Sequence, residues 1–194
     1  ISLRRTRAVH APGANDNASG IAAMLTAAEQ LLALLPRGVE LWLVCSGAGG
    51  DGCSGMRAFL AAQRDWPRAT TYVVGFRCVG GGALHRIERE GPLGDTVHHS
   101  PLAELARRVS ASGMFGSVTP VDWPEDGEAG AAARAGFPAL SLIGLEPDGL
   151  PRNKRLAADL PASLDMESVV RAADFGVAVA RAALRGEAGP IAIL

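Results

Sequence analysis

Asp16 is the residue of this chain best placed to do chemistry. It lies in the loop Pro12-Gly13-Ala14-Asn15-Asp16-Asn17-Ala18-Ser19-Gly20, immediately before an apolar stretch with helical spacing. A carboxylate at this place can ligate a metal ion, with a nearby histidine such as His10 as a second ligand, or it can cap the free backbone N–H groups of the helix. We favour the helix cap, because a zinc site needs three or four protein ligands and Asp16 stands alone.

A glycine-rich loop, Gly47-Ala48-Gly49-Gly50-Asp51-Gly52, follows a predicted strand and precedes a predicted helix. Through Gly47, Gly49 and Gly52 it matches the GxGxxG fingerprint of dinucleotide-binding proteins, and Arg77 ends the next predicted strand, where an arginine can accommodate a 2′-phosphate. We keep a dinucleotide-binding domain as an alternative only, because a fingerprint without its structural context is a weak signal.

The other polar side chains carry weaker signals. The pair His98-His99 would point to opposite sides of an extended segment, which suits metal chelation poorly. Asp51 and Asp126 are expected in loops, with Asp126 a candidate ligand contact. A serine or thiol nucleophile needs a positioned base, and no histidine lies close in sequence to the three candidates of this type, Ser46, Cys53 and Ser54.

Strands and helices alternate along the chain. Apolar residues at helical spacing predict helices over 19–35 and 166–185. Short apolar runs, with β-branched or aromatic residues in the first two, predict strands over 39–45, 70–76 and 138–143. Shorter helices are predicted over 100–110 and 129–135, and a short edge strand over 83–89; Ser100 and Asp165 are predicted helix caps. This order predicts an α/β fold, a three-layer sandwich in which a mixed, mostly parallel sheet has helices on both faces. The whole chain, residues 1–194, is predicted to be a single domain.

Composition excludes some partners. Lys plus Arg number 19 against 20 Asp plus Glu, so the basic excess expected of a nucleic-acid-binding protein is absent, and no apolar run approaches the length of a membrane span. The cysteines, Cys45, Cys53 and Cys78, lack the spacing of a disulfide scaffold. We therefore expect free thiols, with Cys45 in the core, and a slight preference for the cytoplasm in an otherwise undecided localisation. Because the chain begins at Ile1 inside an apparent strand, we expect an N-terminal portion of the domain to be missing.

The two loops and the order of the elements resemble metallopeptidase family 28, the co-catalytic zinc aminopeptidases, whose fold is shared by glutaminyl cyclase, nicastrin and the transferrin receptor ectodomain. The loop that ends at Gly20 is the most specific match, and further matches cover Gly47 to Phe59, Ala135 to Leu140 and Asp159 to Ser168. The resemblance implies an aminopeptidase-like domain over nearly the whole chain. It also implies a site for two zinc ions bridged by an aspartate, with a separate glutamate as the base.

Carried over to this chain, the resemblance leaves most of that site without donors. The bridging aspartate is Asp16, whereas the base glutamate and its neighbouring ligand fall on Gly49 and Gly50. The remaining former metal positions carry Ser2, Arg4, Arg77 and Arg155. Because fixed guanidinium cations repel a metal ion, we expect no bound zinc and no other cofactor, and we expect Asp16 to pair with Arg77 or Arg155 instead.

These observations predict a catalytically degenerate homologue of the zinc aminopeptidases that binds a peptide, a small anionic ligand or another protein in the former substrate cleft. Its candidate ligand contacts are Asp16, Arg77, Asp126 and Arg155, and no catalytic residue is assigned. The alternative under the same resemblance is an active metallo-aminopeptidase with zinc, whose ligands lie in missing residues or at other positions. The fold does not decide between the two, because function resides in the site.

Overall fold

A computed structural model describes residues 10–94, 96–98, 100–187 and 192–193 of the chain. In chain order the regular elements of this described part are α1 (Ser19–Leu32), α2 (Ser54–Ala62), β1 (Thr71–Arg77), β2 (Ala83–Glu90), β3 (Thr96–Val97), α3 (Pro101–Ala111), β4 (Thr119–Trp123), α4 (Glu128–Arg134), β5 (Ala139–Leu145), α5 (Met166–Ala182) and β6 (Ala192–Ile193). They alternate between helices and strands from α3 onward, whereas α1 and α2, and then β1 to β3, follow one another directly.

The strands form one mixed sheet in the order β3-β2-β5-β1-β6, with β4 also paired to β2. β1 runs parallel to β5 over Val73–Arg77, and on its other edge it pairs with β6 at Thr71 and Tyr72. β2 runs parallel to β4 but antiparallel to β3 and β5. The carboxyl ends of β1 and β5 therefore meet at one end of the sheet, where loops collect polar side chains.

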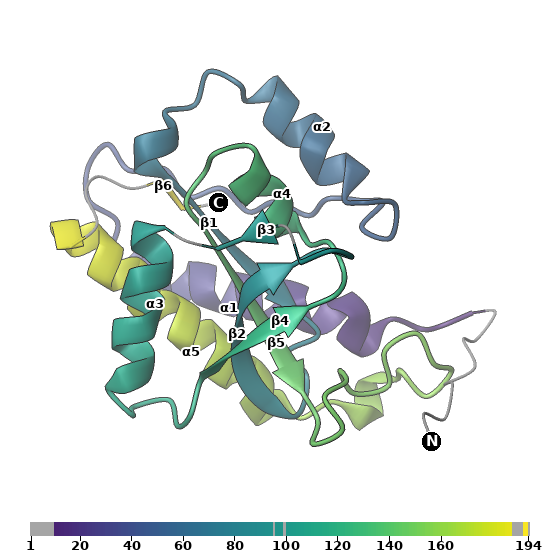
Figure 1. Cartoon of the computed structure of the whole chain (residues 1–194). Helices are drawn as coiled ribbons and strands as arrows, with labels where there is room; N and C mark the ends of the chain where they lie inside the picture. Colours follow the sequence, from purple (N-terminus) through teal and green to yellow (C-terminus); the bar gives the residue numbers. More distant parts are fainter. Residues whose placement is uncertain (1–9, 95, 99, 188–191, 194) are drawn as a thin grey trace.

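Helices cover both faces of the sheet, which confirms the three-layer prediction (Figure 1). On one face, α1, α3 and α5 share a core with Tyr72 of β1 and Leu142 of β5. On the other face, α2 and α4 pack around Val73 of β1 through side chains such as Met56 and Ala132. Tyr72 and Val73 are neighbours that face opposite layers because side chains alternate along a strand.

Two predicted helix starts are confirmed by their caps. The Ser100 hydroxyl accepts the Ala103 N–H at 3.3 Å in front of α3, and the Asp165 carboxylate accepts the Glu167 N–H at 3.0 Å in front of α5. Each side chain satisfies one of the backbone donors that a helix start leaves free. None of the helices in the described ranges combines the length and the apolar character needed to cross a membrane.

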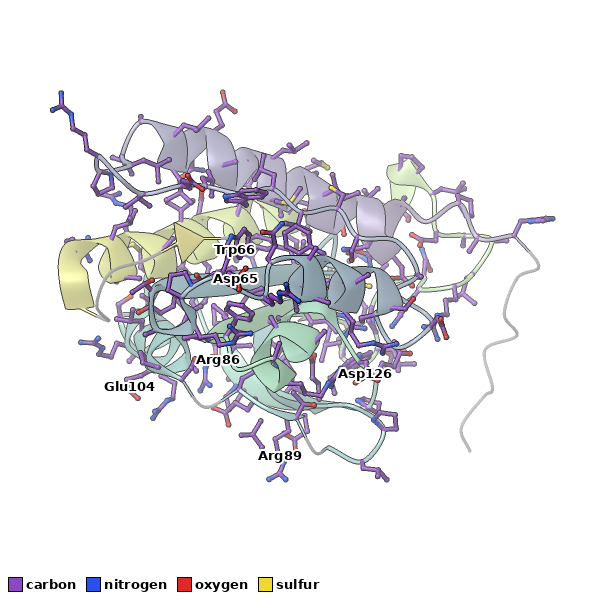
Figure 2. The ribbon with its side chains drawn as sticks, turned by 90° about the horizontal axis from the view of Figure 1, so that it is seen from above. Asp65, Trp66, Arg86, Arg89, Glu104 and Asp126 are labelled. Carbon is purple, nitrogen blue, oxygen red and sulfur yellow. The ribbon has the colours of Figure 1, made fainter. Side chains whose placement is uncertain are left out.

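The predicted strand over 39–45 is wrong. Only Leu41 makes an isolated strand-type bridge, and the neighbouring Trp42 and Leu43 are 37% and 46% exposed. Cys45, expected in the core, is also exposed. An apolar run is visible in a sequence, whereas the neighbouring strand that must supply its hydrogen bonds is not. The segment is held by side chains instead: the Trp42 ring lies 5.0 Å from that of Trp66, which Figure 2 labels.

The strand predicted over 83–89 exists but is not an edge strand. It is β2, and its residues His85 to Ile87 pair with β5 on one side and with β4 on the other. Burial along β2 follows its place inside the sheet: Leu84 and Ile87 are buried, whereas Glu88 is exposed at 44% of its side chain.

Candidate functional site

The loop before α1 is fixed from its inner side by two buried residues. The Asp159 carboxylate accepts the backbone N–H groups of Asn15 and Asp16 at 2.6 and 3.2 Å. The Asn15 side chain donates to the carbonyl of Arg152 and accepts the N–H of Gly80, both at 2.8 Å. Asn15 and Asp159 are wholly buried, so these bonds are shielded from water and hold the loop rigidly.

A second asparagine fixes the loop from the side of β1. The side-chain amide of Asn17 donates from Nδ2 to the Phe76 carbonyl at 2.8 Å, and its Oδ1 accepts the Cys78 N–H at 2.8 Å. Gly20, one helical turn further on, must stay small, because a Cβ there would lie 2.4 Å from the Phe76 carbonyl oxygen. The loop is therefore tied to the carboxyl end of β1.

Asp16, between the two asparagines, does not cap α1. The helix start has no side-chain cap, so the capping hypothesis is wrong. Asn15 and Asn17 orient the loop so that the carboxylate between them turns away from the helix and lines an open cavity. Its polar contacts there are Cys78 Sγ at 3.5 Å and Arg155 Nε at 3.9 Å.

The cavity has a volume of about 880 Å³ and lies along β1, the start of α1 and the segment before α2. All four predicted ligand contacts line it, namely Asp16, Arg77, Asp126 and Arg155, as do Gly49 and Gly50. Figure 2 shows Asp126 toward the end of the molecule where the chain enters α1, opposite Glu104. Ser2 and Arg4, the other two former metal positions, lie outside the described residues.

Three cations converge on one carboxylate, Glu125, at the carboxyl end of β1. Arg77 Nη2 lies 3.4 Å from Glu125 Oε2, Arg155 Nη1 lies 3.1 Å from Oε1, and Lys154 Nζ bonds Oε2. We call Arg77, Lys154 and Arg155 the cation cluster. The side chains of Arg77 and Lys154 are only 13% and 9% exposed, whereas 32% of Glu125 is exposed. Arg155, at 36%, is about as exposed as Glu125, so Arg77 and Lys154 are the buried part of the arrangement.

The surroundings of Glu125 favour its ionised form. Burial by itself would raise the pKa of this carboxyl, but the hydrogen bond and charge of Lys154, together with the charges of Arg155 and Arg77, outweigh burial and lower the pKa below its usual value. Glu125 is therefore the ionised partner that allows three cations to lie together. The expected pair of Asp16 with an arginine is formed with Arg155, at a longer distance than the Arg155–Glu125 contact.

A buried carboxylate, Glu90, lies behind Arg77. Glu90 is completely buried, and its oxygens lie 3.7 Å from Arg77 Nη1 and 3.6 Å from His98 Nε2. Neither oxygen has a hydrogen-bond partner among the described residues. It fits against α4 only because residue 130 is glycine: a Cβ there would lie 1.4 Å from Glu90 Oε1. Arg77 is thus held between an inner and an outer carboxylate.

The remaining sequence candidates are scattered. His10 and Asp51 are exposed, His98 is buried beside Glu90, and His99 lies outside the described residues. Ser46 and Cys53 border the cavity, but burial raises the pKa of the Cys53 thiol to about 11, aided by the charge of Glu128, which disfavours a nucleophilic thiolate. Asp126 lines the cavity while pairing with Arg134 at 2.8 Å.

The glycine-rich loop lacks the context of a dinucleotide site. The fingerprint requires a strand directly before it, and residues 42–46 form none. Arg77 is already engaged by Glu90 and Glu125. Gly49 instead borders a carboxylate, because a Cβ at this position would lie 3.3 Å from Glu128 Oε1.

Sequence reasoning missed Glu125, Lys154 and Glu128. Glu125 is adjacent to Asp126 in Pro124-Glu125-Asp126, and Lys154 is adjacent to Arg155. Glu125 and Lys154, which bond each other, thus lie next to residues that the sequence analysis named. A signal was present in the sequence: Arg152-Asn153-Lys154-Arg155 is a dense basic run in a chain without basic excess. Such a run needs counter-charges if any of it is buried.

The described donors do not fit the zinc pair that the resemblance implies. No group of three or more His, Cys, Asp or Glu side chains able to hold a metal ion occurs in the part of the chain that the structure describes. Of the nearest donors to Asp16, the Cys78 thiol has its pKa raised by burial and by Asp16 itself, and Glu125 is engaged by the cation cluster. Three fixed positive charges oppose a divalent cation at this place.

The sequence was compared with protein families and with curated proteins. The sequence model described as "Peptidase family M28" matches residues 4–171. No match to this sequence is found among the curated proteins.

Solved structures share the fold. Two structures of BSAP, a zinc aminopeptidase from Bacillus subtilis, superpose with TM-scores of 0.73 and 0.70 at 19% and 20% identity, and cover 91% and 89% of this chain. An aminopeptidase from Aneurinibacillus sp. strain AM-1 superposes with a TM-score of 0.68 at 22% identity, over 91% of this chain. The chain spans only 43% of the BSAP length and 41% of the other. At these identities the likeness shows the fold alone.

Proposed function

The chain belongs to peptidase family M28, and on that premise we propose that it is a catalytically degenerate homologue of the zinc aminopeptidases that binds a ligand in its cavity without hydrolysing it. The observation that carries this proposal is the cation cluster, whose three members surround Glu125 where the family resemblance expects metal ligands. Glu125, together with Glu90 beside Arg77 and Asp16 beside Arg155, supplies the negative charge that these three cations need, so the arrangement requires no metal ion to be stable.

The cavity suits a ligand of peptide size. It holds about 880 Å³, within the usual range for small-molecule and peptide sites. Its lining combines apolar side chains, such as Ile21 and Met24, with the charged groups of Asp16, Glu125 and the cation cluster. A peptide or a small anionic ligand is therefore the ligand class we propose.

The test is elemental analysis of protein purified without chelators, combined with an aminopeptidase assay. We expect less than one zinc ion per chain, no activity that chelators abolish, and no difference between the wild type and Asp16→Ala. Asp51→Ala, which removes an exposed carboxylate, is the matched control. One or two zinc ions per chain that are lost in Asp16→Ala but retained in Asp51→Ala would refute the proposal.

An active metallo-aminopeptidase is the second candidate. It is favoured by Asp16, whose carboxylate still faces the cavity, and by the family membership. Under this hypothesis zinc would raise the thermal midpoint of the wild type but not of Asp16→Ala, since a ligand that binds only the folded state stabilises it. The same two variants therefore separate the candidates.

A further inference from the structure

Glu125 does not satisfy the cation cluster evenly. All three cations share its Oε2 atom: Lys154 Nζ bonds this oxygen, and Arg77 Nη2 and Arg155 Nη2 each lie 3.4 Å from it. Oε1 is contacted by Arg155 Nη1 at 3.1 Å. Hydrogen bonds between a nitrogen cation and an oxyanion are usually about 2.7–2.9 Å long, so both arginine contacts with Oε2 are long. A carboxylate offers two oxygens, for which three cations must compete.

A phosphoryl group would fit the cation cluster better than a carboxylate. It has three terminal oxygens that point in different directions, so each cation can bond an oxygen of its own. Guanidinium groups bond phosphate oxygens in pairs, and a lysine contacts them as a point charge. At neutral pH a phosphate monoester carries a charge of about −1.5 to −2, which is more than the single charge of Glu125. Acceptor number and charge both favour a phosphoryl group.

Arg77 is held in place from behind. Its guanidinium packs under the start of α4, where a Cβ at Gly127 would lie 2.6 Å from Nη1, and the buried Glu90 carboxylate lies 3.7 Å from the same atom. The glycine at position 127 therefore gives the guanidinium the room that it needs, while Nη2 contacts Glu125. A cation held in this way loses little freedom when a ligand binds, which favours affinity.

The loop after β5 presents Lys154 and Arg155. Asn153 and Arg155 have left-handed backbone conformations, with φ values of 51° and 60°. Residues other than glycine adopt this conformation at a cost, and those that do are concentrated at active sites and ligand clamps. The loop is also tied down on its inner side, where the Arg152 carbonyl accepts a hydrogen bond from Asn15 Nδ2 at 2.8 Å. The backbone that carries the two cations is thus fixed before a ligand binds.

The cation cluster lies at the carboxyl ends of β1 and β5, which is where open α/β sheets bind their ligands, and all its members line the cavity. We propose that the cation cluster binds the phosphoryl group of a small phosphorylated molecule, and that Glu125 occupies this site as an internal substitute that the ligand displaces. Glu125 is a third exposed, so it can turn to solvent without opening the core. This inference rests on the proposed binding function and narrows its ligand class.

The neighbouring charges admit an anion. Once Glu125 leaves, the three cations face two carboxylates, Glu90 and Asp16, and keep a net positive charge. Residues 1–9 contain three arginines and no acidic residue, so they supply no carboxylate that could replace Glu125. The site needs no empty volume of its own, because the phosphoryl group takes the place that a carboxylate of this chain already fills. The rest of the ligand lies in the cavity of about 880 Å³.

The experiment compares phenyl phosphate with benzoate by titration calorimetry on the full chain, since these probes share a ring and differ in the anionic group. At low ionic strength, where charge contacts are least screened, phenyl phosphate should bind at least about tenfold tighter. Equal or tighter binding of benzoate would overturn the phosphoryl inference and leave the proposed function standing. Binding of neither probe would also overturn the inference. An apolar tetrapeptide, titrated in the same way, would then uphold the proposed function by binding or contradict it by not binding.

Two arginine variants show whether the anion uses the cation cluster. Arg155→Gln should weaken phenyl phosphate binding about tenfold, because a charge-assisted contact is lost. The matched control is Arg107→Gln, which removes a half-exposed arginine that pairs with Glu104 on α3 and should leave the affinity unchanged. Figure 2 shows Glu104 at the opposite end of the molecule from Asp126, which lines the cavity. Equal weakening in both variants would indicate unspecific attraction by surface charge and refute the site.

Glu125→Gln tests the displacement. The neutral amide competes less with an anion, so phenyl phosphate should bind about tenfold tighter than to the wild type, and Glu104→Gln, the matched control, should leave the affinity unchanged. Because a ligand that binds only the folded state stabilises it, phenyl phosphate should also raise the thermal midpoint of Glu125→Gln more than that of the wild type. This second readout holds even where the variant is less stable. Unchanged or weaker affinity in Glu125→Gln would show that Glu125 does not compete with the ligand.

Discussion

Asn15 and Asp16 are neighbours in the chain but lie in very different surroundings. Asn15 is wholly buried and uses its backbone and its side chain to bond Asp159, Arg152 and Gly80. Asp16 turns its carboxylate to the cavity, where its closest cation is 3.9 Å away. The inner side of the loop is thus fixed by short, shielded bonds, and the cavity side by long, solvated ones.

The difference explains how a metal-binding motif can be recognised where its other ligands are missing. Asn15, Asn17, Ser19 and Gly20 all have structural tasks: Ser19, for example, donates to the Asn15 carbonyl at 2.9 Å, and Gly20 has no room for a side chain. A sequence match to this loop therefore indicates the fold and not the presence of a metal site. The chemistry must be judged from the residues that face the cavity.

The largest effect is expected from Asp159→Ala. Two backbone N–H groups, of which that of Asn15 is buried, would lose a charged acceptor. Because a hydrogen bond to a charged group contributes about 1.5–3 kcal/mol, the free energy of unfolding should fall by about 3–5 kcal/mol. Asp16→Ala, on the other side of the same loop, should change it by less than about 0.5 kcal/mol. Urea denaturation of both variants measures the contrast. Similar losses in the two variants would mean that the cavity side is as structural as the inner side.

An intermediate effect is expected at Asn17. Asn17→Ala removes both bonds to β1 and should destabilise by about 1–2 kcal/mol, because each neutral hydrogen bond contributes about 1 kcal/mol. Asn17→Asp keeps the acceptor for the Cys78 N–H but loses the donor to the Phe76 carbonyl, so it retains one of the two hydrogen bonds to β1. Hydrogen exchange at Cys78 distinguishes them: its amide should exchange faster in Asn17→Ala than in Asn17→Asp. If the exchange rate of the Cys78 amide is the same in both variants as in the wild type, the Asn17 side chain does not hold the loop to the end of β1.

The smallest effect is a pH dependence at Glu125. Its pKa is lowered in the folded chain, so its contribution to stability is present above the ordinary glutamate pKa of about 4.3 and is lost as the pH falls through the lowered folded value. Glu125→Gln should therefore be less stable than the wild type at pH 7, and the difference should shrink as the pH is lowered from 7 to below about 4.3. The difference should be small, since a third of Glu125 is exposed. A constant difference across this range would show that the cation cluster does not depend on the Glu125 charge.

Most of the scaffold could be predicted from the sequence. The helical spacing before Leu32 and after Asp165, the β-branched run at β1 and the apolar run at β5 each identify an element by local pattern alone. The segment 39–45 could not be judged in this way, because its apolar residues favour a strand whether or not a neighbour is available. In the structure, Trp42 and Leu43 of this segment are exposed.

The site was less predictable than the scaffold. Arg77 and Arg155 were found because the family resemblance placed them, but their shared partner Glu125 lies 48 and 30 residues away in the chain. Ion pairs over such separations depend on how loops meet at the end of the sheet. The helix-cap interpretation of Asp16 was wrong for the same reason, since the bonds that turn its carboxylate outward come from Asp159 and β1.

The fit of Glu90 against Gly130 restricts the order in which this protein can change over evolution. A methyl group at position 130 would overlap the buried carboxylate of Glu90. Residue 90 must therefore become shorter before residue 130 can carry a side chain. Shortening residue 90 alone, in turn, deprives Arg77 of its inner counter-charge. The two positions are therefore epistatic: each substitution is harmful alone, and a lineage that leaves the Glu-Gly combination must cross a less stable intermediate or first neutralise position 77.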